Sequence, residues 1–218
     1  MPEPNPFETH STEYDAWFDE NAAVYESELL AIRELLPPAG DWVEIGVGSG
    51  RFASRLGIPL GIEPAQAMAA LARTRGVEVL AGRAEALPLD DASVDAAFLI
   101  TTLCFVDDVD RAVREVARVL RPGGHAIVAF LPADSRLGEL YCARASEDRF
   151  FRHATLPAKQ RVFDAIGGAG LEIERTVQTL TGMPERANER IERPTEGHAR
   201  GSFIVIRAAK RCRAQFSP

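Results

Sequence analysis

A short apolar run followed by three alternating glycines is the clearest chemical signal in this chain. Residues 42–45, Trp-Val-Glu-Ile, have the composition of a buried strand, and residues 50–56 start a helix. Gly46, Gly48 and Gly50 connect the two. Glycine lets the backbone approach a ligand where a Cβ atom would collide, and the first N–H groups of a helix lack partners within it. The arrangement predicts a nucleotide-binding site.

The spacing of the glycines separates two classes of nucleotide site. The dinucleotide pattern G-x-G-x-x-G requires glycine where this chain has Arg51. The observed pattern is E-x-G-x-G-x-G, and its carboxylate, Glu44, repels a pyrophosphate but suits a cationic amino group. A second acid, Glu63, follows the apolar run 60–62 at the distance where a carboxylate accepts hydrogen bonds from ribose hydroxyls. Glu63 fits NAD and S-adenosylmethionine sites equally.

Four ordered motifs resemble the class I S-adenosylmethionine (SAM) methyltransferases, and within them the type 11 group that includes the ubiquinone and menaquinone methyltransferases. The glycine loop is similar to motif I of this family, and Glu63 stands at its ribose position. Residues 82–95 are similar to the run G-D-A-E-x-L-P-F-x-D-x-S-F-D, and residues 118–124 match the turn R-V-L-R/K-P-G-G. The resemblance covers residues 12–207. It implies in-line transfer of a methyl group from SAM to a small-molecule acceptor, with S-adenosylhomocysteine (SAH) as product.

The resemblance also implies which residues hold the cofactor. In the family, residues after Gly82 hold the adenine; Arg83 replaces the usual aspartate, and its plane can stack on the ring. The start Tyr-Asp-Ala-Trp-Phe at 14–18 resembles a segment that folds over the SAM pocket, although packing on the core is an equal alternative. The predicted cofactor residues are Tyr14, Trp17, Glu44, Gly46, Gly48, Gly50, Glu63, Pro64, Arg83, Ala84, Glu85 and Thr101.

The acceptor site is less defined by the sequence. Segments 131–156 and 181–201 are predicted to be acceptor-site loops, because loops at the carboxyl end of a sheet usually carry specificity. For 181–201 a solvated loop or a subunit contact remains open. Candidate catalytic side chains are His153 and Tyr141, without a firm general base. No metal site is expected, since the three cysteines are scattered.

The order of the elements predicts an α/β fold: a doubly wound, mostly parallel seven-stranded sheet of Rossmann-like type with an antiparallel last strand. Residues 12–210 form one domain between a flexible tail, 1–11, and a C-terminal tail, 211–218. Residues 12–37 form an N-terminal cap helix with a break near Asn21. Strands are expected near 42–46, 58–63, 77–81, 95–100, 125–130, 171–177 and 202–207, and helices near 50–56, 65–75, 109–120 and 156–168.

The amino-acid composition limits the kinds of binding partner that we expect for this protein. The net charge of −7 argues against nucleic acid, because binding to phosphate needs a basic surface. The absence of a signal peptide or a long apolar run predicts a cytoplasmic protein without membrane insertion, as a monomer or homodimer. Two alternatives remain: an NAD(P)-binding oxidoreductase, although the chain lacks the Tyr-x-x-x-Lys pair, and a non-catalytic SAM-binding regulatory module.

Overall fold

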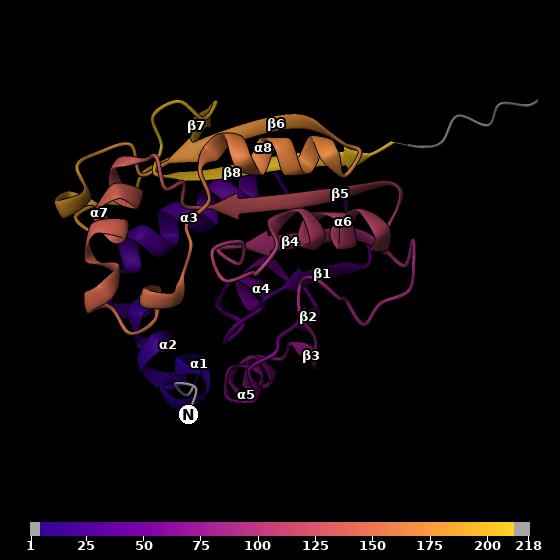
Figure 1. Cartoon of the computed structure of the whole chain (residues 1–218), viewed down its shortest axis with the longest axis horizontal. Helices are drawn as coiled ribbons and strands as arrows, with labels where there is room; N and C mark the ends of the chain where they lie inside the picture. Colours follow the sequence, from indigo (N-terminus) through magenta and orange to yellow (C-terminus); the bar gives the residue numbers. More distant parts are fainter. Residues whose placement is uncertain (1–4, 212–218) are drawn as a thin grey trace, which may run out of the picture.

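Apolar strands buried on both faces form the centre of the molecule, whose computed structural model describes residues 5–211 (Figure 1). The sheet order is β3-β2-β1-β4-β5-β8-β6-β7. The pairs from β3 to β5 are parallel, whereas β8 runs antiparallel to both β5 and β6. The strands are β1 (Trp42–Ile45), β2 (Leu60–Ile62), β3 (Glu78–Leu80), β4 (Val94–Ile100), β5 (Leu120–Phe130), β6 (Leu171–Thr179), β7 (Thr195–Glu196) and β8 (Phe203–Lys210).

The predicted fold class is confirmed, with two differences in detail. β7 is a two-residue strand on the edge beyond β6, which makes an eight-stranded sheet of the described residues. β5 begins at Leu120 and runs through the expected Pro-Gly-Gly turn, because Leu120 pairs with Val94 of β4 before the register shifts. The antiparallel strand β8 lies inside the sheet, between β5 and β6.

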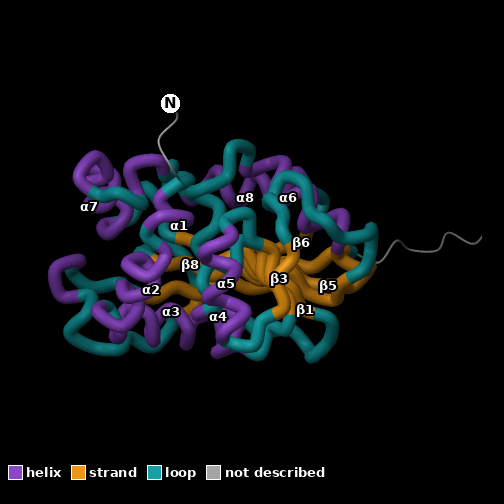
Figure 2. Tube along the Cα trace, turned by 90° about the horizontal axis from the view of Figure 1, so that it is seen from below, coloured by secondary structure: helices purple, strands orange, loops and turns teal. Residues whose placement is uncertain are grey.

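Helices cover both faces of the sheet (Figure 2). One apolar cluster joins α3, α4 and α5 to one face, and a second joins α6 and α8 to the other. Helices α1, α2 and α7 gather beyond the carboxyl ends of the parallel strands (Figure 1). The helices are α1 (Pro6–Thr9), α2 (Ser11–Glu20), α3 (Ala22–Glu34), α4 (Arg51–Leu56), α5 (Gln66–Thr74), α6 (Val109–Val119), α7 (Arg136–Arg144) and α8 (Lys159–Gly168). No helix within 5–211 is both long and apolar enough to cross a membrane.

The N-terminal segment is more ordered than the sequence suggested. The predicted tail 1–11 is wrong for its described part, because Pro6–Thr9 form α1. The Asn5 side chain caps this helix by accepting a hydrogen bond from the N–H of Phe7. The predicted break at Asn21 divides the cap helix into α2 and α3. Residues 1–4, and 212–218 of the predicted C-terminal tail, lie outside the described residues.

Replacing Gly50 by alanine should destabilise the fold, and Gly57→Ala provides a matched control. Both glycines have positive φ, +80° and +75°, where a Cβ costs about 1–2 kcal/mol. A Cβ on Gly50 would also lie 2.9 Å from Cα of Ala72, whereas one on Gly57 meets nothing within 4 Å. Gly50→Ala should therefore lose about 1–3 kcal/mol more of the free energy of unfolding in urea titrations. Equal losses would show that the contact with Ala72 relaxes freely.

Candidate functional site

Backbone hydrogen bonds hold the glycine loop against the end of β2. Gly46, Gly48 and Gly50 all have positive φ, as their spacing predicted for a tight turn. The N–H of Gly46 donates to the carbonyl of Ile62 over 2.8 Å. Glu63 then accepts from the N–H of Gly48 through Oε2 and from Ala65 through Oε1, each over 2.9 Å. The buried Glu63 carboxylate thus joins the glycine loop, which follows β1, to the end of the neighbouring strand β2.

A cavity of about 350 Å³ opens in front of this loop, and we call it the glycine-loop cavity. It lies between the carboxyl ends of β1, β2 and β4, where open α/β sheets bind ligands. Its walls contain most of the predicted cofactor residues: Tyr14, Gly46, Gly48, Glu63, Pro64, Arg83, Ala84, Glu85 and Thr101, together with the candidate base His153.

Charged side chains hold together the part of the cavity wall that is formed by the segment after β3. Arg83 donates to the Asp107 carboxylate over 2.6 Å, so its guanidinium reaches across to the segment after β4. Glu85 accepts from the N–H of Asp107 over 2.7 Å. Burial would raise the pKa of Glu85, but this hydrogen bond and others from the backbone, with Arg83 nearby, lower it on balance. These contacts fix the edge of the cavity at the position that the resemblance assigns to adenine.

Helix α1, near the N-terminus of the chain, contributes to the wall of the glycine-loop cavity. Phe7 lines the cavity and packs edge-on against Tyr14 and Phe105. The Glu8 carboxylate accepts hydrogen bonds from the first N–H groups of α5, at Gln66 and Ala67. These N–H groups have no partner inside their own helix, and a carboxylate at a helix start is favourable. Residues that the sequence analysis left in a tail therefore complete the site.

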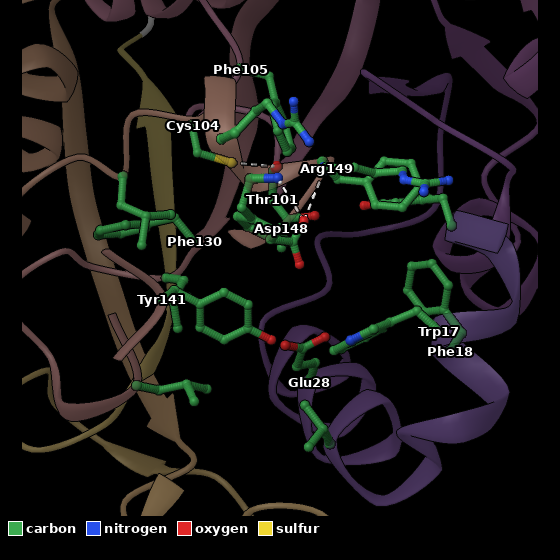
Figure 3. A pocket seen from close by; sticks show the side chains of 18 of the residues that line it. Trp17, Phe18, Glu28, Thr101, Cys104, Phe105, Phe130, Tyr141, Asp148 and Arg149 are labelled. Atoms are coloured by element: carbon green, nitrogen blue, oxygen red, sulfur yellow. Dashed lines mark hydrogen bonds between the residues drawn. The ribbon is translucent and has the colours of Figure 1, made fainter. Parts of the chain in front are cut away.

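A second cavity, of about 470 Å³, lies between α2, α3, α7 and the segment 147–152 (Figure 3), and we call it the aromatic cavity. Most of its surface is apolar. Its aromatic side chains are Tyr14, Trp17, Phe18, Phe52, Phe105, Phe130, Tyr141, Phe150 and Phe151.

The two cavities share one wall. Tyr14, Thr101, Phe105 and Phe150 line both of them. Thr101 directly follows β4 and has φ +51°, an unusual conformation for a residue with a Cβ. Its N–H donates to the carbonyl of Ala129 over 2.8 Å. Non-glycine residues in this region store strain that the surroundings must compensate, and such residues gather at functional sites. A ligand in either cavity would thus contact the same four side chains.

One buried carboxyl group faces the aromatic cavity. Glu28 of α3 is 7% exposed, and no hydrogen-bond partner of its side chain lies within residues 5–211. Burial raises its pKa to about 8. Figure 3 shows the Tyr141 hydroxyl directed toward this carboxyl group from α7. Burial, with Glu28 nearby, raises the pKa of Tyr141 to about 12, so this phenol stays protonated.

A charged cluster joins the N-terminal helices to the glycine loop. Arg51 donates from Nε and Nη2 to the two oxygens of Asp15 on α2, over 2.9 and 2.8 Å. Arg75 donates to Asp15 over 2.7 Å and to the carbonyl of Ser49 over 2.8 Å. Burial opposes ionisation of Asp15, but the hydrogen bonds from the Arg51 and Arg75 guanidiniums lower its pKa to about 2. Arg51, which stands where the dinucleotide pattern requires glycine, therefore holds helix α2 of the N-terminal cap against the glycine loop.

Three predicted cofactor residues do not reach the glycine-loop cavity. Trp17 lines the aromatic cavity only. Gly50 packs against Ala72 of α5, which explains the need for glycine there. Glu44 is 1% exposed beneath α4, and its Oε2 has no hydrogen-bond partner. Burial raises the pKa of Glu44 well above its usual value, against a smaller opposing effect of the Ala53 N–H. Side chains alternate across a strand, so Glu44 points to the face that α4 covers, opposite to Val43 and Ile45.

The predicted acceptor segments differ in where they lie. Segment 131–156 contributes to the aromatic cavity, but much of it is helical, with α7 and the 3₁₀ turns Ala145–Glu147 and Phe151–His153. Segment 181–201 lines neither cavity, although all of it is described. It supports the start of α3 instead: Asn188 accepts from the N–H of Ala23, and the N–H of Glu192 donates to Ser27.

The candidate catalytic residues lie in different cavities. Tyr141 faces the aromatic cavity, and His153 lines the glycine-loop cavity. Cys104 lies in the wall of the aromatic cavity, where burial raises the pKa of its thiol to about 12 and keeps it protonated. Within residues 5–211, no group of three histidine, cysteine, aspartate or glutamate side chains could hold a metal ion.

Sequence reasoning missed Glu28, Phe7, Phe105 and Phe150. A signal for Glu28 was present: it lies three residues after Tyr25 and four before Ile32, on the buried face of α3. A carboxylate on an apolar helix face is unusual and deserves a functional explanation. The phenylalanines carried no such signal, because each comes from a different segment and only folding brings them together.

Comparisons with known proteins show the family and the fold of the chain. A family described as methyltransferase domain matches residues 43–128. A crystal structure from Thermotoga maritima, described as "SAM-dependent methyltransferase, possible histamine N-methyltransferase", is 44% identical with a TM-score of 0.89, over 94% of this chain and 98% of that one. An uncharacterized protein of Methanocaldococcus jannaschii is 32% identical over 94% of this chain and 99% of its own length. Malonyl-[acyl-carrier protein] O-methyltransferase of Methylococcus capsulatus is 35% identical over 58% of this chain and 50% of that protein.

Glu28→Gln should make the protein less sensitive to alkaline pH. The pKa of Glu28 is about 8 in the folded state. Between about pH 5 and about pH 8, the folded protein therefore holds a proton that the unfolded chain has released. The contribution of Glu28 to the free energy of unfolding must then fall as pH rises through this window, by up to about 1.4 kcal/mol per pH unit. Glutamine removes this dependence, so the stability of the variant relative to wild type should increase with pH.

Urea titrations across this pH window measure the effect. Glu26→Gln is the matched control, because Glu26 lies on the same helix and pairs with Arg55 at the surface over 2.8 Å. Its loss should change stability by less than about 1 kcal/mol. A Glu28→Gln difference that is constant with pH would contradict the elevated pKa.

Proposed function

Because this chain belongs to the class I SAM-dependent methyltransferases of type 11, we propose that it methylates a small molecule held in the aromatic cavity. The observation that carries this proposal is the wall that the two cavities share. A donor in one cavity and an acceptor in the other would meet beside Tyr14, Thr101, Phe105 and Phe150. Two reactants held side by side gain the entropic advantage of an intramolecular reaction.

The glycine-loop cavity has the chemistry to bind SAM. Glu63 uses one acceptor site for Gly48 of the loop and one for Ala65, and a carboxylate offers about four, so acceptors remain for ribose hydroxyls. Gly48 presents backbone to the cavity, where a Cβ would approach only the Met68 side chain at 3.4 Å. Ala84 and Arg83 lie where the family holds adenine. Gly46, Gly48, Glu63 and these two residues are the proposed cofactor contacts, with Tyr14 as the covering residue.

The chain's own contribution to methyl transfer is approach geometry and a dry site. When bound, SAM supplies a methyl group that is already activated by its positively charged sulfur. The aromatic rings exclude water from the acceptor, and α1 and α2 close the site from outside. Thr101 fixes the shared wall through its backbone hydrogen bond to Ala129. The acceptor atom would attack in line, opposite the sulfur.

A small molecule suits this site better than a polymer. The aromatic cavity is mostly apolar and about 470 Å³ in volume, within the range of small-molecule sites. The net charge of −7 continues to argue against a nucleic-acid acceptor. The name of the Thermotoga maritima relative includes histamine N-methylation, so amines belong among the acceptors to be tested.

Calorimetric titration with SAH, and with NADH in parallel, tests the cofactor assignment. We expect micromolar binding of SAH alone. Binding of NADH alone would favour the oxidoreductase alternative. SAH binding without methyl transfer to any member of a broad acceptor panel, followed by mass spectrometry, would favour a regulatory SAM-binding module.

Gly48→Val should abolish SAH binding, with Gly57→Val as the control. Both positions have positive φ, so valine introduces similar backbone strain in each. Only at position 48 would the branched side chain enter the glycine-loop cavity. We expect at least a tenfold weaker affinity for SAH in Gly48→Val and an unchanged affinity in Gly57→Val. Equal affinities in the two variants would exclude this loop from the cofactor site.

Glu63→Gln should weaken SAH binding by about 10- to 100-fold, because a neutral amide makes weaker hydrogen bonds to ribose and cannot accept at both of its heteroatoms. A urea titration in the absence of ligand separates this effect from loss of the contacts to Gly48 and Ala65. A variant that is less stable but binds SAH normally would limit Glu63 to holding the loop.

A further inference from the structure

The buried carboxyl group of Glu28 has no structural partner to explain it. Its side chain is 7% exposed, faces the aromatic cavity, and makes no hydrogen bond to any described residue. Taking a carboxyl group out of water without a partner destabilises a protein by several kcal/mol. Glutamine or leucine would fill this position on α3 at lower cost. The position therefore suggests a ligand that supplies the missing interaction.

The surroundings of Glu28 select the charge of that ligand. Figure 3 shows the Trp17 indole nitrogen and the Tyr141 hydroxyl turned toward Glu28, and neither group is a cation. Burial raises the pKa of Tyr14 and Tyr141, so both phenols stay protonated and uncharged. Aromatic side chains make up much of the cavity wall, and aromatic rings attract cations through their quadrupoles. Cys104, in the wall of the aromatic cavity, is also neutral, because burial raises the pKa of its thiol. The charged residues of the described lining are Glu13, Glu20, Glu147 and Asp148 against Arg149 and Arg152, so carboxylates exceed guanidiniums.

We propose that the methyl acceptor is an amine with an apolar or aromatic body, and that Glu28 binds its nitrogen as an ammonium ion and then removes its proton. This inference rests on the proposed function and names the substrate class of the same site. The apolar body would occupy the space between the rings of α2 and the segment 150–151. Tyr141 remains a donor or acceptor beside the carboxyl group (Figure 3).

The transfer balances with groups that are present. An ammonium ion has no lone pair, so it must lose a proton before attack, and the Glu28 carboxylate accepts it. The nitrogen lone pair forms the N–C bond while the S–C bond breaks and leaves its electrons on sulfur. Positive charge passes from sulfur to nitrogen, and Glu28 releases its proton to solvent afterwards. A carboxyl group with a pKa near 8 suits this exchange, because a general base works best near the pH of the reaction.

Amine binding should release a proton, which distinguishes a chemical role of Glu28 from a structural one. At about pH 7 the empty site holds Glu28 mainly protonated, and the free amine is mainly an ammonium ion. Their complex retains one of these two protons. Binding should therefore release about one proton per amine.

Calorimetry of the SAH-saturated protein tests the proposal. Benzylamine, 2-phenylethylamine and hexylamine are compared with the alcohols of the same carbon skeleton, in buffers of different ionisation enthalpy at neutral pH. We expect at least one amine to bind tenfold or more tightly than its alcohol, with proton release, and to give an N-methylated product when SAM replaces SAH.

Two variants make the test specific. Glu28→Gln should lose both the preference for amine over alcohol and the proton release while retaining SAH affinity. Glu26→Gln, on the outer side of α3, should behave as wild type in all three measurements.

The outcomes separate the two levels of inference. If SAH does not bind, the proposed function is wrong. If SAH binds but no amine binds more tightly than its alcohol, or Glu28→Gln retains the preference and the proton release, the amine assignment is wrong.

Discussion

The pairing of Asp15 with Arg51 and Arg75 is the constraint on which the site depends. Arg51 begins α4 directly after the glycine loop, Arg75 ends α5 and holds the carbonyl of Ser49, and Asp15 belongs to α2. The Asp15 side chain is 14% exposed and that of Arg51 is 18% exposed, so water screens this pair less than a surface pair. Asp15, together with Asp19 on the same helix, thereby joins α2 to the start of α4. Tyr14 of this helix lines both cavities, so the same ion pairs hold a residue of the shared wall.

The two cavities differ in the kind of interaction that they offer. The glycine-loop cavity presents backbone, Glu63 and the Arg83–Asp107 pair, which suits a polar nucleoside with hydroxyls and an exocyclic amine. The aromatic cavity presents rings and one carboxyl group. Methyl transfer needs both kinds, since the donor must be held by its many polar groups and the reacting atom must be kept from water. The strained Thr101 stands where the two environments meet.

Much of the fold and the cofactor site could be predicted from local patterns. The apolar runs of β1, β4 and β5, the alternating glycines and the acid that follows β2 specify a Rossmann-like sheet, because each depends on a few neighbouring residues. The same patterns placed Glu63, Gly46 and Gly48 at one end of the sheet. For Glu44 the cofactor role stays a prediction, because the folded chain buries this side chain outside the lining of the glycine-loop cavity. The local patterns failed for 6–9, where proline at the first turn of a helix was taken as a sign of an extended tail.

By itself, the sequence determined the class of fold, the family and the nucleotide character of the ligand, because spacing along the chain encodes local backbone geometry. Only the tertiary structure shows which residues from distant parts of the chain contact one another. Phe7, Phe105 and Phe150 come together around Tyr14 from segments far apart in the chain. The structural role of Arg51 is visible only in the folded chain, where it pairs with Asp15. Glu28 is one acidic residue among many in the sequence, and its importance follows from burial beside an apolar cavity. Desolvation depends on every atom packed around a group, and no local pattern of residues contains that information.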